Sequence, residues 1–243
     1  MKISLVIAAL TLLVFVSCKK ESSPASAGTT GTNSGAATIT PSNATTFYGI
    51  FNEYHGQSVS GGTLTPTWSY CTAYFTNNPS QYPNVSVYTQ VGSAGMNGVV
   101  FGFQSYQYVD TTYSVTFPPA TWQVAGMGSI PSFTYTNSTP FPTYSAYASL
   151  PDTVHIGPSL VISNAGTAGY SGMTVSVSDA SSHIAAGMLA SGANSVTLST
   201  SSLVATTSGR LVFSLSKNNV QSVNGKDMNF VTNYQLSKTV VIN

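Results

Sequence analysis

Glu53 and His55 come closest to an acid–base pair in this sequence. They stand two positions apart in a run that alternates like a β-strand, so their side chains are expected on one face. A third catalytic or metal-binding partner would have to come from His155, His183 or a distant aspartate, and no spacing indicates one. A polar pair on an edge strand explains both residues without chemistry. A hydrolase centred on Glu53 and His55 is therefore retained only as an alternative.

Other sequence signatures of catalysis are missing. The sequence contains neither a His-Glu-x-x-His motif nor a Gly-x-Ser-x-Gly nucleophile elbow. Hydrolysis of glycosides usually needs two carboxylates that face each other. The remaining acidic residues of the main part of the chain stand at expected turns, where a structural role explains them: Asp110, Asp152, Asp179 and Asp227. We therefore predict a non-enzymatic protein with no catalytic residues, no metal site and no cofactor.

A row of aromatic side chains is the feature most typical of a binding surface. In the strand-like run from 67 to 75, three aromatic residues are expected on the face opposite to Cys71, and a second pair follows near residue 107. The candidate ligand platform consists of Trp68, Tyr70, Tyr74, Tyr106 and Tyr108. Sugar rings pack their C–H faces on such rings while neutral amides bond to their hydroxyls. Packing in a core or against another domain is the alternative.

The first residues predict an exported, lipid-anchored chain. Lys2 precedes an apolar run over 3–16, which is too short to span a bilayer but suits a secretory signal. Phe15-Val16-Ser17-Cys18 resembles the bacterial lipobox, although Phe15 replaces the usual leucine. We expect a signal peptide over 1–17 and membrane attachment through lipid on Cys18. A secreted chain that merely has a cysteine near its cleavage site is the alternative.

The cysteine content of the chain rules out an intrachain disulfide, and its charge content limits the classes of partner that it can bind. With Cys18 acylated, only Cys71 remains, so no intrachain disulfide can form, and the alternation around Cys71 predicts a buried thiol. A catalytic or intermolecular cysteine is the alternative. Charged residues make up 5% of the chain, and no Lys or Arg occurs between Lys20 and Arg210. Phosphate binding needs clusters of basic residues, so nucleic acid is excluded as a partner.

The composition divides the rest of the chain into a tether and β-strands. Residues 18–45 are rich in Ser, Thr, Gly and Ala and are expected to form a flexible tether. From there on, short runs rich in Val, Tyr, Phe and Thr alternate with turn residues, and Asn224-Gly225 predicts a hairpin. Strands are expected at 47–55, 67–75, 85–91, 98–108, 113–117, 121–125, 132–136, 154–163, 173–178, 195–200, 210–216, 220–223, 228–231 and 235–242.

This pattern predicts an all-β protein, either a sandwich or a barrel. The composition shifts near Leu150-Pro151, because aromatic and proline residues are concentrated before this point and all four basic residues of the folded part follow it. We therefore expect two β-sandwich domains, immunoglobulin-like or related, over 46–150 and 151–243. A single larger sandwich is the alternative.

Several segments together have a recognisable pattern: Cys18-Lys19-Lys20-Glu21, the polar tether, Val223-Asn224-Gly225-Lys226 and Ser237-Lys238-Thr239-Val240. In these segments the chain resembles small uncharacterised lipoproteins of Bacteroidetes. The resemblance implies an outer-membrane lipoprotein with β-sandwich domains and no known activity. Asp110-Thr111-Thr112 and Asp152-Thr153-Val154 are similar to the O-glycosylation pattern of that phylum, which makes Thr111 and Thr153 candidate sites. Both triplets also read as turns.

Anchor, tether and the shortage of catalytic groups together favour a displayed binding module. The expected partners are the membrane, through Cys18, and a glycan or an envelope protein bound by the folded part. A structural or assembly subunit of an envelope complex is the alternative, in which the aromatic face would be a protein interface. The Lys19-Lys20-Glu21 start leaves open whether the module faces the cell surface or the periplasm.

Overall fold

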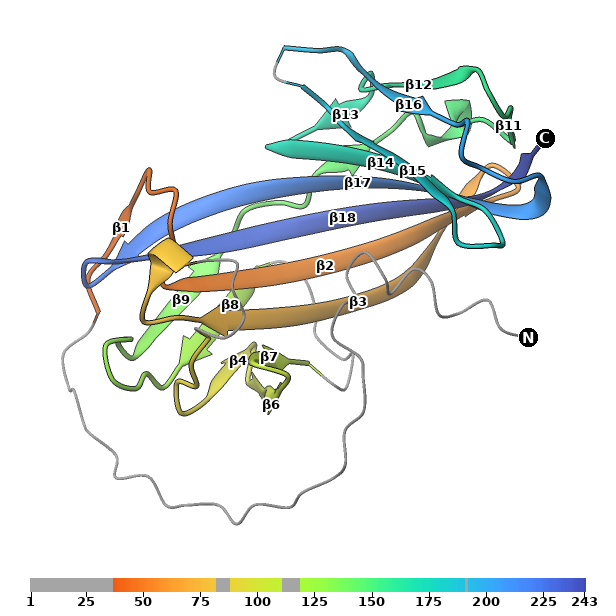
Figure 1. Ribbon diagram of the computed structural model, residues 1–243. Helices are drawn as coiled ribbons and strands as arrows, with labels where there is room; N and C mark the ends of the chain where they lie inside the picture. The colour runs from red at the N-terminus through yellow and green to blue at the C-terminus, as the bar shows by residue number, and fades with distance from the viewer. Residues whose placement is uncertain (1–36, 82–87, 111–118, 191) are drawn as a thin grey trace. The chain divides into compact units, whose positions relative to one another are not determined.

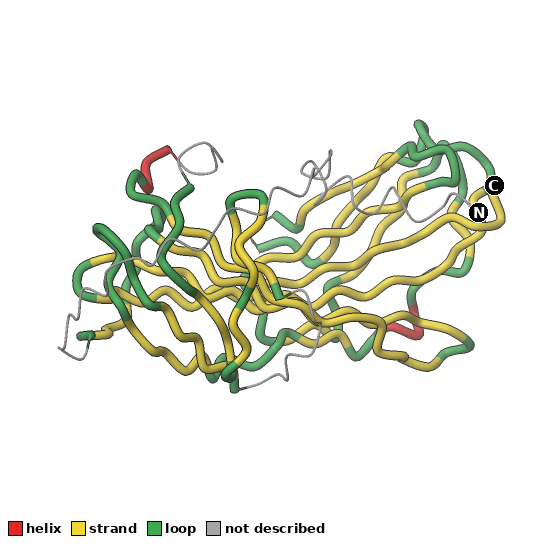
Figure 2. The backbone as a smooth tube through the Cα atoms, turned by 90° about the horizontal axis from the view of Figure 1, so that it is seen from below, coloured by secondary structure: helices red, strands yellow, loops and turns green. Residues whose placement is uncertain are grey.

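The computed structural model describes residues 37–81, 88–110, 119–190 and 192–243. Nearly all of its regular structure is strand, as the tube in Figure 2 shows, so the all-β prediction is confirmed. The helical segments of the described part are the short turns η2 (Pro79–Gln81) and η4 (Tyr147–Ser149). None of the described helices has the length and apolar character needed to cross a membrane. The signal peptide and Cys18 lie outside the described residues.

Ten strands form one large sheet, whose long members lie side by side in Figure 1. Its main path runs β15 (Ile184–Met188), β14 (Gly172–Ser178), β17 (Thr206–Val223), β18 (Lys226–Ile242), β2 (Gly49–Ser60), β3 (Thr63–Phe75), β7 (Gln107–Val109) and β6 (Gly102–Gln104). Two short strands lie off this path: β1 (Ile39–Pro41) pairs with β17, and β11 (Thr153–Val154) pairs with β18.

Three smaller sheets accompany the large one. The first has the order β5 (Val99–Val100), β4 (Ala94–Met96), β8 (Ala120–Val124) and β9 (Phe133–Asn137). The second pairs β12 (Ser159–Ser163) with β16 (Ser195–Ser199), and the third pairs β10 (Thr143–Tyr144) with β13 (Thr167–Ala168). Figure 1 places β8 and β9 towards one end of the long strands, and β12 and β16 towards the other.

The longest element is the β17–β18 hairpin, which turns at Asn224-Gly225 as predicted. Both turn residues have positive φ, 49° for Asn224 and 76° for Gly225, which is the geometry that favours Asn-Gly in two-residue hairpins. Val223 pairs with Lys226 directly across the turn. Each arm of the hairpin joins two segments that were expected to be separate strands, 210–216 with 220–223 and 228–231 with 235–242.

One face of the large sheet, here called the core face, carries two hydrophobic cores. The Trp122 core lies towards the β8–β9 end and includes Phe51, Phe75, Trp122, Val223 and Phe230. The Phe213 core lies towards the β12–β16 end and includes Val175, Leu198, Phe213, Leu236 and Ile242. The register places Phe51 beside Phe230 and Leu236 beside Phe213, so the sheet residues of both cores project from the same side. The opposite side is here called the outer face.

The structure differs from the expected division at Leu150-Pro151. Residues 37–243 form one compact unit, and the large sheet contains strands from both sides of that point. β2 pairs in parallel with β18 from Gly49–Met228 to Val59–Lys238. The expected tether over 18–45 is also too long, because β1 pairs with β17 through Ile39 and Val223. The folded unit therefore begins earlier in the chain than residue 46.

Candidate functional site

Glu53 lies in the interior of the protein. It sits on β2, which is flanked by β18 and β3, so the expected edge strand is wrong. Its side chain is fully buried at the border of the Trp122 core. Trp122 Nε1 and Asn137 Nδ2 both donate to Glu53 Oε1, at 2.9 Å and 3.0 Å. Among the described residues, Oε2 has no hydrogen-bond partner.

Glu53 is the inner end of a polar network between the two cores. Asn219 Nδ2 donates to Asn137 Oδ1 at 3.1 Å and to Tyr135 Oη at 2.9 Å. Burial raises the pKa of Glu53 from 4.5 to about 7, although the hydrogen bonds from Asn137 and Trp122 oppose the shift. A carboxyl group with this pKa is largely protonated below neutral pH, which reduces the cost of burying it.

His55 shares the core face with Glu53, as the alternation predicted, but makes a separate contact. Its Nδ1 lies 3.1 Å from Ser69 Oγ, and burial lowers its pKa. Neither residue lines the pocket at the end of β2 around Lys238 or the pocket beside β4 and β8. These two pockets therefore give the hydrolase hypothesis no support. The described part of the chain also contains no group of three or more His, Cys, Asp or Glu side chains placed to hold a metal ion.

Cys71 pairs with Glu53 across β2 and β3 and is fully buried. Its Sγ lies 3.8 Å from Met96 Sδ in the Trp122 core. Burial, with the negative charges of Glu53 and Asp110, raises the pKa of this thiol, so it stays protonated. The prediction of a buried free thiol is confirmed.

Three aromatic rings form a cluster on the outer face, here called the aromatic cluster: Tyr54, Trp68 and Tyr70. Tyr54 and Tyr70 are directly paired across β2 and β3, and their rings stack with centroids 4.4 Å apart. The Trp68 ring lies 5.3 Å from that of Tyr70 and 6.4 Å from that of Tyr54. All three side chains are half-buried. The sequence predicted Trp68 and Tyr70 but missed Tyr54, whose position next to Glu53 on the alternating strand was the available signal.

The Trp68 indole packs directly against Gly56. The two residues are paired, and the register of β2 and β3 shifts between Gly56 and Gln57. A Cβ atom at position 56 would lie 2.4 Å from Trp68 Cε2 and 2.7 Å from Nε1. The indole therefore rests against the Gly56 backbone, and only glycine leaves room for it there.

The other members of the predicted platform lie elsewhere. Tyr108 is buried, lies in the Trp122 core and accepts a hydrogen bond from the Val91 backbone at 2.9 Å, so it is not a platform residue. Tyr106 is 54% exposed but belongs to the turn between β6 and β7. Tyr74 is half-buried on the outer face, and its ring contacts that of Tyr88 at 5.4 Å. The structure brings together only Trp68 and Tyr70 of the five.

Neutral amide side chains surround the aromatic cluster. Asn233 pairs with Tyr54, and Gln235 pairs with Gly56, across β18 and β2. Asn52 precedes Tyr54 on the same face, and its Nδ2 donates to Thr72 Oγ1 at 3.2 Å. The Nδ2 group of Asn233 is buried with no hydrogen-bond partner among the described residues. The arrangement combines flat apolar rings with uncharged donors and acceptors.

Two of the four aspartates expected at turns, Asp179 and Asp152, make structural contacts, whereas Asp227 lies within β18. Asp179 accepts hydrogen bonds from the backbone nitrogens of Ser181, His183 and Val204. Asp152 forms an ion pair with Lys238 at 2.9 Å. Thr153, a candidate glycosylation site, is half-buried in β11 opposite Val241. The other candidate, Thr111, lies outside the described residues.

Comparisons with protein-family models, with curated proteins and with solved structures find no match to this chain.

Proposed function

We propose that this chain is a lipid-anchored binding module of a bacterial outer membrane, without catalytic activity, and that its aromatic cluster binds glycans. The anchor is inferred from the signal-like start and Cys18, and the display role from the polar segment that follows. The observation that carries the glycan proposal is the set of three adjoining rings, Tyr54, Trp68 and Tyr70, among neutral amides.

The chemistry around the cluster favours a carbohydrate over other ligands. Aromatic rings offer dispersion and C–H contacts to the faces of sugar rings, and Asn and Gln both donate and accept hydrogen bonds. Asn52, Asn233 and Gln235 are uncharged neighbours of the cluster on the same face. Both hydrophobic cores lie on the other face, so packing of these cores does not account for the cluster.

The test is binding of the full chain, purified in detergent, to a panel of polysaccharides and oligosaccharides. Trp68→Ala is expected to weaken glycan binding about tenfold or more, because stacking on one aromatic ring contributes roughly 1–3 kcal/mol where it has been measured for planar ligands. Tyr70→Ala is expected to act in the same direction.

Tyr106→Ala is the matched control, since it removes an exposed tyrosine outside the aromatic cluster. It should leave glycan binding unchanged. Unchanged binding in both Trp68→Ala and Tyr70→Ala would overturn the glycan site. If no glycan binds and the chain instead copurifies with an envelope protein whose binding needs Trp68, the alternative of an assembly subunit replaces it.

A further inference from the structure

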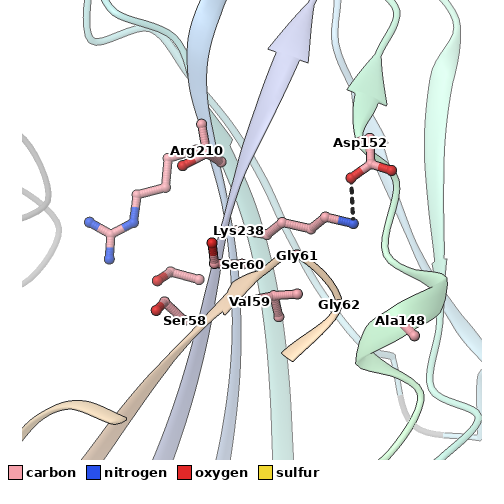
Figure 3. Close-up of a pocket in the computed structure, with 11 residues that line it drawn as sticks. Ser58, Val59, Ser60, Gly61, Gly62, Ala148, Asp152, Arg210 and Lys238 are labelled. Carbon is pink, nitrogen blue, oxygen red and sulfur yellow. Dashed lines mark ion pairs between the residues drawn. The ribbon is translucent and has the colours of Figure 1, made fainter. Parts of the chain in front are cut away.

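A pocket opens where the large sheet changes strands. Along one side of β18, pairing with β2 ends at Lys238, and pairing with β11 begins at Val241. Thr239 and Val240 therefore lie between the two partner strands. The pocket at this gap has a volume of about 590 Å³, and Figure 3 shows the side chains around it.

Two cations line the pocket, and they differ in their partners. The Lys238 ammonium lies on the core face, where it reaches the Asp152 carboxylate at 2.9 Å and the carbonyl oxygen of Leu150. Arg210 projects to the other side in Figure 3, on the side of Ser58. Among the described residues, no carboxylate forms an ion pair with Arg210, and no acceptor bonds to its guanidinium.

The surroundings of Arg210 are those of an anion subsite. The guanidinium is half-buried, and burial lowers its pKa, yet arginine remains charged. Hydroxyl groups of Ser58, Ser60 and Thr239 line the same pocket. A partly desolvated guanidinium that has no acceptor within the described ranges is best satisfied by a ligand with two acceptor oxygens, because its donors form a planar fork.

Arg210 and the aromatic cluster lie on one continuous surface. Arg210 pairs with Thr239, whose side of β18 also carries Ser237 and Gln235, and Gln235 is paired with the Gly56 that supports Trp68. Arg210 and Trp68 are offset by four residues along the strand direction and lie three strands apart across the sheet. At the usual strand dimensions this offset corresponds to roughly 20 Å. An extended oligosaccharide of a few sugar units covers that distance, and the neutral side chains between the two points suit its hydroxyls.

We infer that the glycan bound by this chain is acidic, with its carboxylate or sulfate group held by Arg210 and its sugar rings packed on the aromatic cluster. The inference rests on the proposed function, because it takes the ligand of the cluster to be a glycan. A carboxylate and a sulfate both offer paired acceptor oxygens to the guanidinium of Arg210. The experiment distinguishes between these two anionic groups.

The experiment compares matched polysaccharides with the full chain in detergent: a polyuronate, its carboxyl-reduced neutral form, and a sulfated form of the same neutral backbone. The wild type is expected to bind at least one acidic form about tenfold more tightly than the neutral form, as one charge-assisted pair provides. Arg210→Gln is expected to remove this preference, to leave neutral binding unchanged and to abolish the salt dependence of acidic binding. Whichever acidic form shows the Arg210-dependent gain identifies the anionic group.

Lys226→Gln is the matched control, since it also removes one positive charge, from a lysine that lies 4.1 Å over the Tyr48 ring. It should leave the acidic preference intact. Equal binding of acidic and neutral forms by the wild type, or a preference that survives Arg210→Gln, overturns the inference while the glycan site stands. Absence of binding to all three forms and to the wider panel overturns both.

Discussion

Glu53 illustrates how one buried side chain can resemble a catalytic group in sequence and serve a different purpose in the fold. Its carboxyl group joins Trp122 and Asn137 through a single oxygen and lies beside the buried Cys71. The raised pKa results mainly from burial, not from a neighbouring acid in a cleft. A perturbed pKa alone therefore does not identify a site, because structural networks produce the same shift.

Glu53→Gln is expected to reduce the dependence of stability on pH. The folded state raises the pKa of Glu53 from 4.5 to about 7, so between these values it binds more protons than the unfolded state. The contribution of Glu53 protonation to stability is fully present below the unfolded-state pKa and is lost as pH rises through the folded-state pKa. Between pH 4.5 and about 7, the free energy of unfolding of the wild type therefore falls by about 3 kcal/mol.

Urea unfolding of both proteins at a series of pH values from below 4.5 to above 7 measures the effect. The wild type should lose stability relative to Glu53→Gln as pH rises, because glutamine keeps an acceptor for Trp122 and Asn137 and carries no charge. Parallel stability curves for the two proteins would contradict a protonated Glu53 in the fold.

Strand β17 shows what alternation can and cannot predict. Leu211, Phe213 and Leu215 alternate on the core face and belong to the Phe213 core. The same face continues with Lys217 and Asn219, so the apolar pattern stops although the strand does not. These polar positions lie where the two cores adjoin, and Asn219 bonds there to Tyr135 and Asn137. Such long-range partners are invisible to a local pattern.

The outer face was predicted only in part, for a related reason. Trp68 and Tyr70 were identified from the alternation within one strand, whereas Tyr54 and Gln235 join them through the pairing of β3 with β2 and of β2 with β18. The parallel pairing of β2 and β18 connects segments far apart in sequence, and no local feature encodes it. Tyr108 followed the same aromatic pattern and proved to be a core residue.

Gly56→Ala is expected to displace the Trp68 indole and to weaken the aromatic cluster without removing any ring. The added methyl group would overlap the indole, because a Cβ at this position lies 2.4 Å from Cε2. Overpacking of this kind typically lowers the free energy of unfolding by about 1–3 kcal/mol. The measurements are the fluorescence of Trp68 in a Trp122→Phe background and glycan binding.

Gly61→Ala provides a contrasting glycine variant. Apart from its chain neighbours, no atom of the described residues lies within 4 Å of a Cβ there, although its φ of 57° adds backbone strain. That variant is expected to lower stability while leaving the Trp68 emission unchanged. An unaltered Trp68 spectrum in Gly56→Ala would show that the indole does not rest on this glycine.

The two cores share their longest strands, and this determines how residues 37–243 are held together. Val223 on β17 and Phe230 on β18 belong to the Trp122 core, while Phe213 and Leu236 on the same strands belong to the Phe213 core. Most residues of the Trp122 core precede the composition shift near residue 150 and most residues of the Phe213 core follow it, but the hairpin extends through both cores. Loss of either core therefore exposes strands on which the other depends.

Phe213→Ala is accordingly expected to lower the unfolding midpoint of both cores. A buried Phe→Ala change costs roughly 3–5 kcal/mol, partly through the cavity that it leaves. Trp122, fully buried in the other core, reports on that core alone in a Trp68→Phe background. Because β17 and β18 couple the cores, the Trp122 fluorescence midpoint in urea should fall together with the far-UV circular dichroism midpoint. A Trp122 midpoint equal to that of the parent protein would mean that the cores unfold independently, as two domains would.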